Sequence, residues 1–131
     1  MISENNFLMD SSAWIEYLDA SPLGAKVTKY LENKKYTIIT PNIVTAEVIS
    51  KAARKGKDAG IAIQAIKTLS RESKENVRDY IKAGLSHAEM RKSHSNISLA
   101  DAIILVLAEK NKAKIITKDY HLKGKNTIFL E

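Results

Sequence analysis

Four acidic residues from separate parts of the chain could together bind a metal ion. Asp10 follows the apolar run 7–9, Glu47 and Asp101 lie in expected helices, and Asp119 follows the apolar run 114–117. Carboxylates at one site repel one another and raise each other's pKa, and a divalent cation relieves that repulsion. Because hard oxygen ligands select hard cations, the expected ion is Mg²⁺ or Mn²⁺. Beside a basic surface such an ion suggests phosphodiester cleavage, since it lowers the pKa of a bound water and orients the phosphate.

The elements that must position these acids are short apolar strands separated by helices. Hydrophobic spacing predicts strands at 7–9, 36–39, 114–117 and 127–130, and helices at 11–20, 22–31, 41–55, 58–69, within 79–92, and 98–111. Thr40 is expected to cap the helix that Pro41 opens. This alternation is typical of an α/β protein, so we expect a three-layer α/β/α sandwich with a mostly parallel sheet of four or five strands.

The sheet brings three of the acids toward one edge. Sites in open parallel sheets form at the carboxyl ends of strands, where Asp10 and Asp119 lie and where the helix of Asp101 begins. The last two strands are joined by only nine residues, 118–126. That is too few for a helical crossover of the usual length, so their pairing stays open.

The helix that contains Asp101 is apolar on every side, which predicts that it is buried. A charge at the start of a buried helix is costly unless a proton, a cation or hydrogen bonds compensate it. Ser98, three residues earlier, resembles the first member of a capping box. Asp101 is therefore either a helix cap or one of several carboxylates at a site.

The other acids also have simpler interpretations. Asp10 could only cap the helix that follows it, and Asp119 could only stabilise a turn. Glu47 could form a surface pair with Lys51, four residues later, which is worth tenths of a kcal/mol. Each signal is weak alone, and the four together favour a shared cation.

The length and composition of the chain are typical of a soluble globular protein. The 131 residues suit one domain, 1–131, and the absence of cysteine excludes disulfides, iron–sulfur clusters and cysteine-based zinc sites. No basic segment followed by an apolar run begins the chain, and no apolar run approaches the ~20 residues of a membrane span. We therefore expect a cytoplasmic protein that has no membrane span and no membrane partner.

A net charge of +6 favours polyanionic partners. The densest basic patch could hold an RNA backbone or could simply be a solvated helix end; it consists of Lys51, Arg54, Lys55 and Lys57. The histidines show no metal-ligand spacing, and His121 is the best candidate for chemistry because it lies near Asp119; the others are His87 and His94.

The acidic motifs in their order resemble those of the PIN-domain nucleases. The motifs are Phe-Leu-Met-Asp10-Ser-Ser12, Thr-Ala-Glu47-Val, Ser-Leu-Ala-Asp101-Ala and Ile-Ile-Thr117-Lys-Asp119. Size and coverage resemble the single-domain VapC-type toxins of toxin–antitoxin pairs. The resemblance implies an α/β/α fold, Mg²⁺- or Mn²⁺-dependent endoribonuclease activity, neutralisation by a small cognate antitoxin, and a homodimer.

Residue by residue, the resemblance makes the four acids the metal-binding and catalytic groups, with Ser12 and Thr117 supporting them by hydrogen bonds. Many relatives carry an acid and an aromatic residue just beyond the last motif, where this chain has His121 and Leu122. Two other functions stay open. One is an RNA-processing nuclease without an antitoxin, and the other is a non-catalytic RNA- or protein-binding module whose acids only cap helices.

Overall fold

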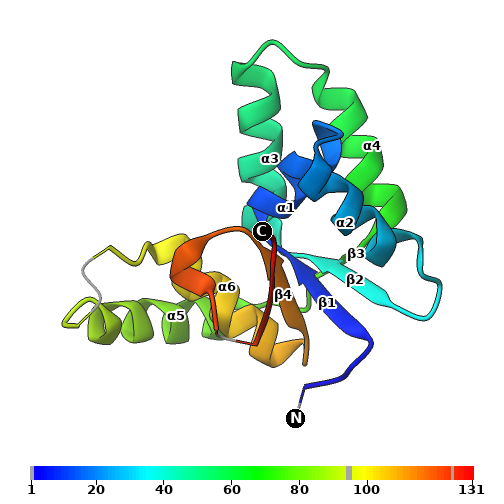
Figure 1. The fold of residues 1–131 in the computed structure, drawn as a ribbon. Helices are drawn as coiled ribbons and strands as arrows, with labels where there is room; N and C mark the ends of the chain where they lie inside the picture. The colour runs from blue at the N-terminus through cyan, green and yellow to red at the C-terminus, as the bar shows by residue number, and fades with distance from the viewer. Residues whose placement is uncertain (1, 94–95, 125) are drawn as a thin grey trace.

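The computed structural model describes residues 2–93, 96–124 and 126–131, and a five-stranded parallel sheet lies at its centre (Figure 1). The strands are β1 (Asn6–Met9), β2 (Thr37–Thr40), β3 (Arg71–Glu72), β4 (Lys114–Thr117) and β5 (Thr127–Phe129). Their order across the sheet is β3-β2-β1-β4-β5. The predicted α/β fold with a parallel sheet is confirmed.

Helices cover both faces of this sheet. The helices are α1 (Ser11–Leu18), α2 (Pro22–Glu32), α3 (Asn42–Arg54), α4 (Ala59–Leu69), α5 (Val77–Met90) and α6 (Leu99–Lys110). Figure 1 shows α1 to α4 gathered together and α5 packed along α6 on the other side. This division follows from right-handed crossovers, because the chain moves from β1 to β3 in one direction across the sheet and then returns to β4.

The register of the central strands aligns their carboxyl ends. Leu8 pairs with Ile39 of β2 and with Ile115 of β4, and all three side chains are buried. Asp10, directly after β1, is held there because its backbone N–H donates to the carbonyl of Ile116 at 3.1 Å. The residues that follow β1 and β4 are thus neighbours at one sheet edge.

Thr40 was predicted to cap a helix, and this prediction is wrong. Thr40 ends β2, and its hydroxyl accepts a hydrogen bond at 3.0 Å from the indole N–H of the fully buried Trp14. Pro41 takes the position before α3 and makes no side-chain cap. A buried indole N–H requires an acceptor, and Thr40 supplies it.

Two features of the sheet were not predicted. Strand β3 is only two exposed, charged residues, so no apolar pattern marks it. The nine-residue link between β4 and β5 contains the short 3-10 helix η1 (Tyr120–Leu122), and the two strands still pair in parallel. The buried Leu122 anchors this compact crossover.

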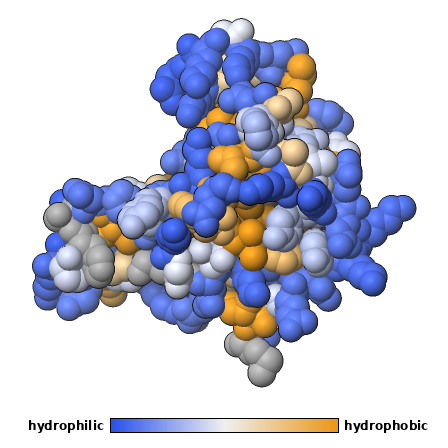
Figure 2. Space-filling view, viewed as in Figure 1, coloured by the Kyte–Doolittle hydropathy of each residue, from blue (hydrophilic) through white to orange (hydrophobic). Residues whose placement is uncertain are grey.

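The surface is mostly hydrophilic on the face shown in Figure 2, with apolar side chains mainly along the middle of the molecule. Among the described residues, no helix has the length and apolar character needed to cross a bilayer.

Candidate metal centre

The four predicted acids line one pocket of about 330 Å³ at the carboxyl ends of β1 and β4. The lining residues are Asp10, Ser11, Ser12, Glu47, Ser98, Ala100, Asp101, Ile104, Lys118 and Asp119. Asp10 and Asp101 are buried, Asp119 is half-buried, and Glu47 is exposed. Residues up to 109 positions apart in the chain therefore meet at one site.

Asp10 is held by three hydrogen bonds. Its Oδ1 accepts from the backbone N–H of Ser11 at 2.8 Å, which caps α1. Its Oδ2 accepts from the hydroxyls of Thr117 at 2.7 Å and Ser12 at 3.0 Å. The structure thus places Ser12 and Thr117 where they fix the direction of the Asp10 carboxylate.

Thr117 also connects Asp10 with Asp119. Its fully buried hydroxyl accepts from the backbone N–H of Asp119 at 2.8 Å. Ser12 makes the parallel connection, because its hydroxyl accepts from the backbone N–H of Lys118 at 3.0 Å. The ends of β1 and β4 are therefore joined by side-chain hydrogen bonds as well as by the sheet.

Asp101 and Asp119 are neighbours in the pocket, with carboxylate oxygens within 4.8 Å of each other. Asp101 forms the predicted capping box: its Oδ2 accepts from the backbone N–H of Ser98 at 3.3 Å, and its own N–H donates to the Ser98 hydroxyl at 3.0 Å. Asp119 begins η1, with its Oδ1 accepting from the backbone N–H of His121 at 2.9 Å. The capping roles considered for these acids are present, together with their convergence on one pocket.

Glu47 closes the pocket from α3. Among the described residues it forms no ion pair with Lys51, so the surface-pair interpretation is not supported. Instead, desolvation of its carboxyl group by the surrounding pocket residues and the nearby Asp10 carboxylate raise its pKa, although its residue is exposed overall, and a hydrogen bond from Ser11 opposes part of this effect.

Burial raises the pKa of Asp10 and Asp101 as well. Burial is the largest cause for Asp10, and the hydrogen bonds from Thr117, Ser12 and Ser11 lower the pKa only in part. Burial and the adjacent Asp119 carboxyl raise the pKa of Asp101. The pocket therefore favours the binding of positive charge, supplied either by protons on the carboxyls or by a metal cation.

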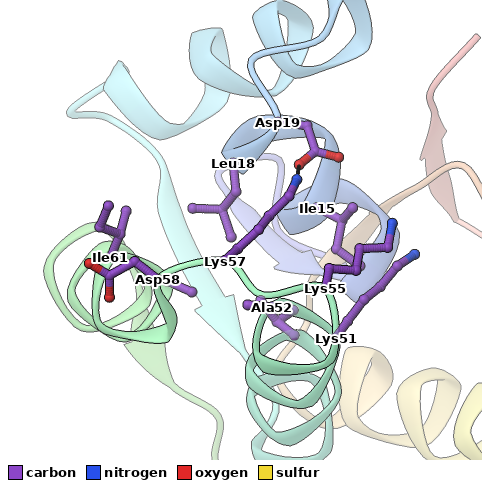
Figure 3. Close-up of a pocket in the computed structure, with 11 residues that line it drawn as sticks. Ile15, Leu18, Asp19, Lys51, Ala52, Lys55, Lys57, Asp58 and Ile61 are labelled. Atoms are coloured by element: carbon purple, nitrogen blue, oxygen red, sulfur yellow. Dashed lines mark hydrogen bonds and ion pairs between the residues drawn. The ribbon is translucent and has the colours of Figure 1, made fainter.

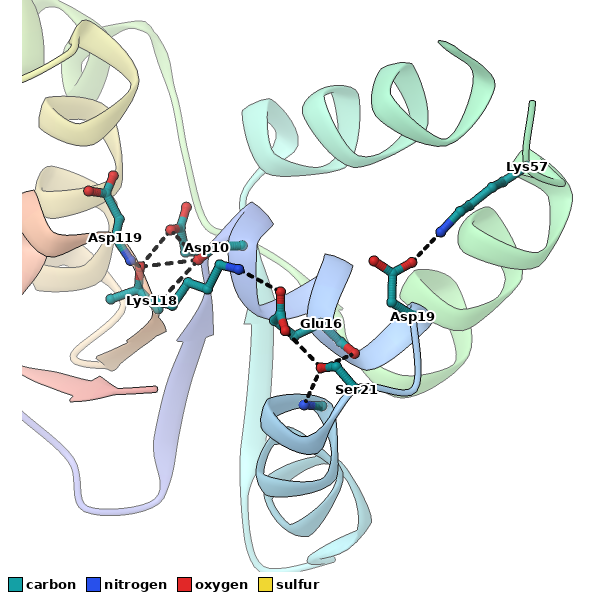
Figure 4. Close-up of polar contacts among 10 residues, drawn as sticks. Asp10, Glu16, Asp19, Ser21, Lys57, Lys118 and Asp119 are labelled. Carbon is teal, nitrogen blue, oxygen red and sulfur yellow. Dashed lines mark hydrogen bonds and ion pairs between the residues drawn. The ribbon is translucent and has the colours of Figure 1, made fainter. Parts of the chain in front are cut away.

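Lys118 is a pocket residue that the sequence analysis did not identify. Its ammonium group lies 2.7 Å from Glu16 Oε2, so it points along the rim and away from the acids (Figure 4). This contact, with a hydrogen bond from Ser21, lowers the pKa of Glu16. Apart from its position between Thr117 and Asp119, nothing in the sequence distinguishes this lysine from the others.

The predicted basic patch divides into two parts. Lys51 and Arg54 line a groove of about 480 Å³ that shares Ser11, Ser12 and Glu47 with the acidic pocket. Lys55 and Lys57 instead line a smaller apolar pocket between α1, α3 and α4, which Lys51 also lines and where Lys57 pairs with Asp19 (Figures 3 and 4). Only the first pair adjoins the acids.

The histidines differ in their surroundings. His87 Nε2 lies 3.1 Å from the carbonyl oxygen of Ile97, a structural contact, and His94 lies outside the described residues. His121 lies beside Asp119, which lines the pocket, with Nδ1 3.2 Å from Asp119 Oδ1. Its ligand atom and those of Asp101 and Asp119 lie within 4.8 Å of one another.

The donor set fits a hard divalent cation. Carboxylate oxygens approach from β1, α3, α6 and the end of β4, and their crowding already favours positive charge. Among the described residues, the ligand atoms that lie close enough together to share one ion are those of Asp101, Asp119 and His121, whereas Asp10 and Glu47 line the same pocket. Mg²⁺ and Mn²⁺ are the ions that such oxygen ligands suit.

Comparison with known proteins gives one family and one fold. The family model described as PIN domain matches residues 7–126. No curated protein matches the sequence.

Several solved structures share the fold at low sequence identity. VapBC2 from Rickettsia felis, bound to a DNA fragment from its promoter, has a TM-score of 0.73 and 16% identity, with 95% of this chain and 96% of that chain covered. VapC20 from Mycobacterium tuberculosis, a toxin that cleaves the sarcin–ricin loop, has a TM-score of 0.66 and 18% identity, with 87% and 88% covered. VapBC-1 from nontypeable Haemophilus influenzae has a TM-score of 0.66 and 18% identity, with 92% and 91% covered.

Proposed function

Because the chain belongs to the PIN-domain family, we propose that it is a Mg²⁺- or Mn²⁺-dependent endoribonuclease that acts as the toxin of a VapBC-type toxin–antitoxin pair. The observation that carries the proposal is the convergence of Asp10, Glu47, Asp101 and Asp119 on one pocket. The VapC and VapBC structures of the same fold support the toxin assignment.

The four acids would hold the cation, and a different secondary-structure element positions each carboxylate. When bound, the cation lowers the pKa of a water and stabilises negative charge on the phosphate. Hydrolysis then forms a bond from the water oxygen to phosphorus and breaks the bond to the leaving ribose oxygen, which receives the proton. Ser12 and Thr117 act as positioning residues, because they hold the Asp10 carboxylate through Oδ2.

The groove beside the pocket would take the RNA backbone. Lys51 and Arg54 line it, and their charges attract phosphates. Lys118, at the pocket rim, is within reach of the same backbone if it leaves Glu16. Lys55 and Lys57 do not line this groove, so we assign them no direct role in RNA binding.

The remaining parts of the proposal concern the cellular setting. We propose a cytoplasmic protein that is neutralised by a small cognate antitoxin and that forms a homodimer, in keeping with the VapBC resemblance. Growth arrest on expression, and rescue by the product of a small neighbouring gene, test the toxin assignment.

Cleavage-site mapping on total RNA, with and without Mg²⁺ or Mn²⁺, tests the enzymatic proposal. Asp10→Asn and Asp101→Asn are expected to abolish metal-dependent cleavage while the proteins stay folded. Asp58→Asn is a matched control, because Asp58 caps α4 through the backbone N–H of Gly60 at 2.8 Å and lies outside the acidic pocket. Cleavage by Asp10→Asn at the parent rate would refute the assignment.

A further inference from the structure

We propose that His121 is a direct ligand of the bound cation, so that the position between Asp101 and Asp119 is a mixed oxygen–nitrogen site that prefers Mn²⁺ to Mg²⁺. The inference rests on the proposed function, since it concerns the same pocket. It goes further by adding a ligand outside the four acids and by giving the site a metal preference.

The distances carry the inference. Asp101, Asp119 and His121 each offer a ligand atom, and these atoms lie within 4.8 Å of one another. Ligands at about 2.1 Å from one ion are separated by at most about 4.2 Å. Shifts of a few tenths of an ångström would therefore bring the three atoms around one cation.

The local structure brings the His121 ring to this position. Asp119 Oδ1 accepts from the His121 backbone N–H at 2.9 Å, which turns the chain into η1 directly after the acid. The neighbouring Leu122 is completely buried and anchors that turn. The His121 side chain is 48% exposed, so it can adjust toward an ion without disturbing the core.

The contact between His121 and Asp119 is of the kind that a cation can replace. Nδ1 lies 3.2 Å from Asp119 Oδ1, so the ring nitrogen and the carboxylate oxygen already face each other. His87 provides the contrast. Its Nε2 lies 3.1 Å from the Ile97 carbonyl oxygen, and among the described residues His87 is not one whose ligand atom lies near Asp101 and Asp119.

The chemistry of the ring determines the metal preference. Mg²⁺ is a hard cation that takes oxygen ligands almost exclusively. An imidazole nitrogen favours first-row transition-metal ions instead, and Mn²⁺ is the one of these that also suits carboxylate oxygens. Asp101 and Asp119 alone would suit either ion, and His121 shifts the balance toward Mn²⁺.

Mn²⁺ can be used directly as the probe. Pulsed electron paramagnetic resonance of Mn²⁺ bound to the parent protein should show nitrogen coupling from one imidazole. His121→Ala should remove this coupling and lower Mn²⁺ affinity about tenfold in calorimetric titration, with a loss of less than about threefold for Mg²⁺. His121→Asp, which supplies an oxygen ligand, should restore Mg²⁺ binding without restoring the nitrogen coupling.

His87→Ala is the matched control and should keep both the coupling and the affinity. Thermal unfolding of each metal-free variant shows whether it is folded. Bound Mn²⁺ without nitrogen coupling, or equal losses of Mn²⁺ and Mg²⁺ affinity in His121→Ala, would overturn the inference and leave the proposed function standing. If the parent protein bound neither ion, the proposed function would fail as well.

Discussion

Replacement of Asp101 by asparagine is expected to stabilise the metal-free protein and to remove its stabilisation by Mn²⁺. Asp101 is buried beside Asp119, and its pKa is raised by burial and by that neighbour. The asparagine side-chain oxygen can still accept from Ser98 N–H, so the cap on α6 is kept. The substitution therefore removes charge repulsion with little change in helix capping.

The size of the effect follows from the geometry. Carboxylate oxygens of Asp101 and Asp119 lie within 4.8 Å, where two unit charges repel by about 3 kcal/mol at an effective dielectric constant of about 20. The Asp119 side chain is 30% exposed, and solvent screening reduces the expected gain to about 1 kcal/mol. In a domain of this size that corresponds to a rise in Tm of roughly 3–5 °C.

The metal response should change in the opposite direction. At a Mn²⁺ concentration of about 100 times Kd, the parent protein gains about 2.7 kcal/mol, or roughly 10 °C in Tm. Asp101→Asn should show little of this gain. Thermal unfolding by circular dichroism, with EDTA or with Mn²⁺ at a pH where all four carboxyls are ionised, measures both effects.

Asp79→Asn is the matched control, because Asp79 forms the capping box of α5 with Asn76. Asp79 also pairs with Lys110 at 2.7 Å, which lowers its pKa, so its neutralisation should lower Tm in EDTA. The Mn²⁺ response of this variant should be complete. If Asp101→Asn behaved in the same way as Asp79→Asn in both measurements, Asp101 would be only a cap.

Three further predictions use the same network. The pKa values of Asp10, Glu47 and Asp101 are raised in the folded protein. At a pH above the ordinary pKa values of 3.8 for aspartate and 4.5 for glutamate, the folded protein therefore binds more protons than the unfolded chain does. Metal-free stability should therefore fall as pH rises through the raised values while Mn²⁺ affinity increases, as measured by unfolding and calorimetry over a pH series. Thr117→Val removes the buried hydroxyl that donates to Asp10 at 2.7 Å and should cost about 1–3 kcal/mol in urea unfolding, whereas Thr117→Ser should cost less. Lys118→Met should weaken RNA binding and should reduce the slope of log binding constant against log salt concentration by about one, with Mn²⁺ affinity unchanged. An unchanged slope would show that Lys118 is not part of the RNA interface.

Hydrophobic patterning predicted most of the fold because the main elements bury continuous apolar runs. The β1 residues Phe7, Leu8 and Met9 are all at most 4% exposed, and α6 is buried along most of its length. Strand β3 escaped prediction because it is held by two backbone pairings to β2 and has no buried side chain. Thr40 was misassigned because its partner, the Trp14 indole, lies 26 residues away in the sequence.

The acids were predictable because strand ends and helix starts converge at one edge of a parallel sheet. Lys118 was not, because a lysine between Thr117 and Asp119 is ordinary in sequence and becomes informative only when its ammonium is seen on Glu16. The division of the basic patch has a similar origin. Lys51 and Arg54 line the groove beside Glu47, whereas Lys55 and Lys57 line only the pocket that contains Asp19 and Asp58, which Lys51 also reaches.

Capping and metal binding are compatible roles for the same carboxylates. Asp10, Asp101 and Asp119 each accept a backbone N–H at the start of a helix, and each such bond restricts the direction in which the side chain points. A carboxylate retains lone pairs after one such bond, so capping leaves oxygen available to a cation. The caps also offset part of the cost of holding the acids together before a cation arrives, because helix starts favour negative charge. Acids placed by caps are therefore oriented for a cation in advance, whereas acids on mobile surface side chains would have to be ordered when it binds.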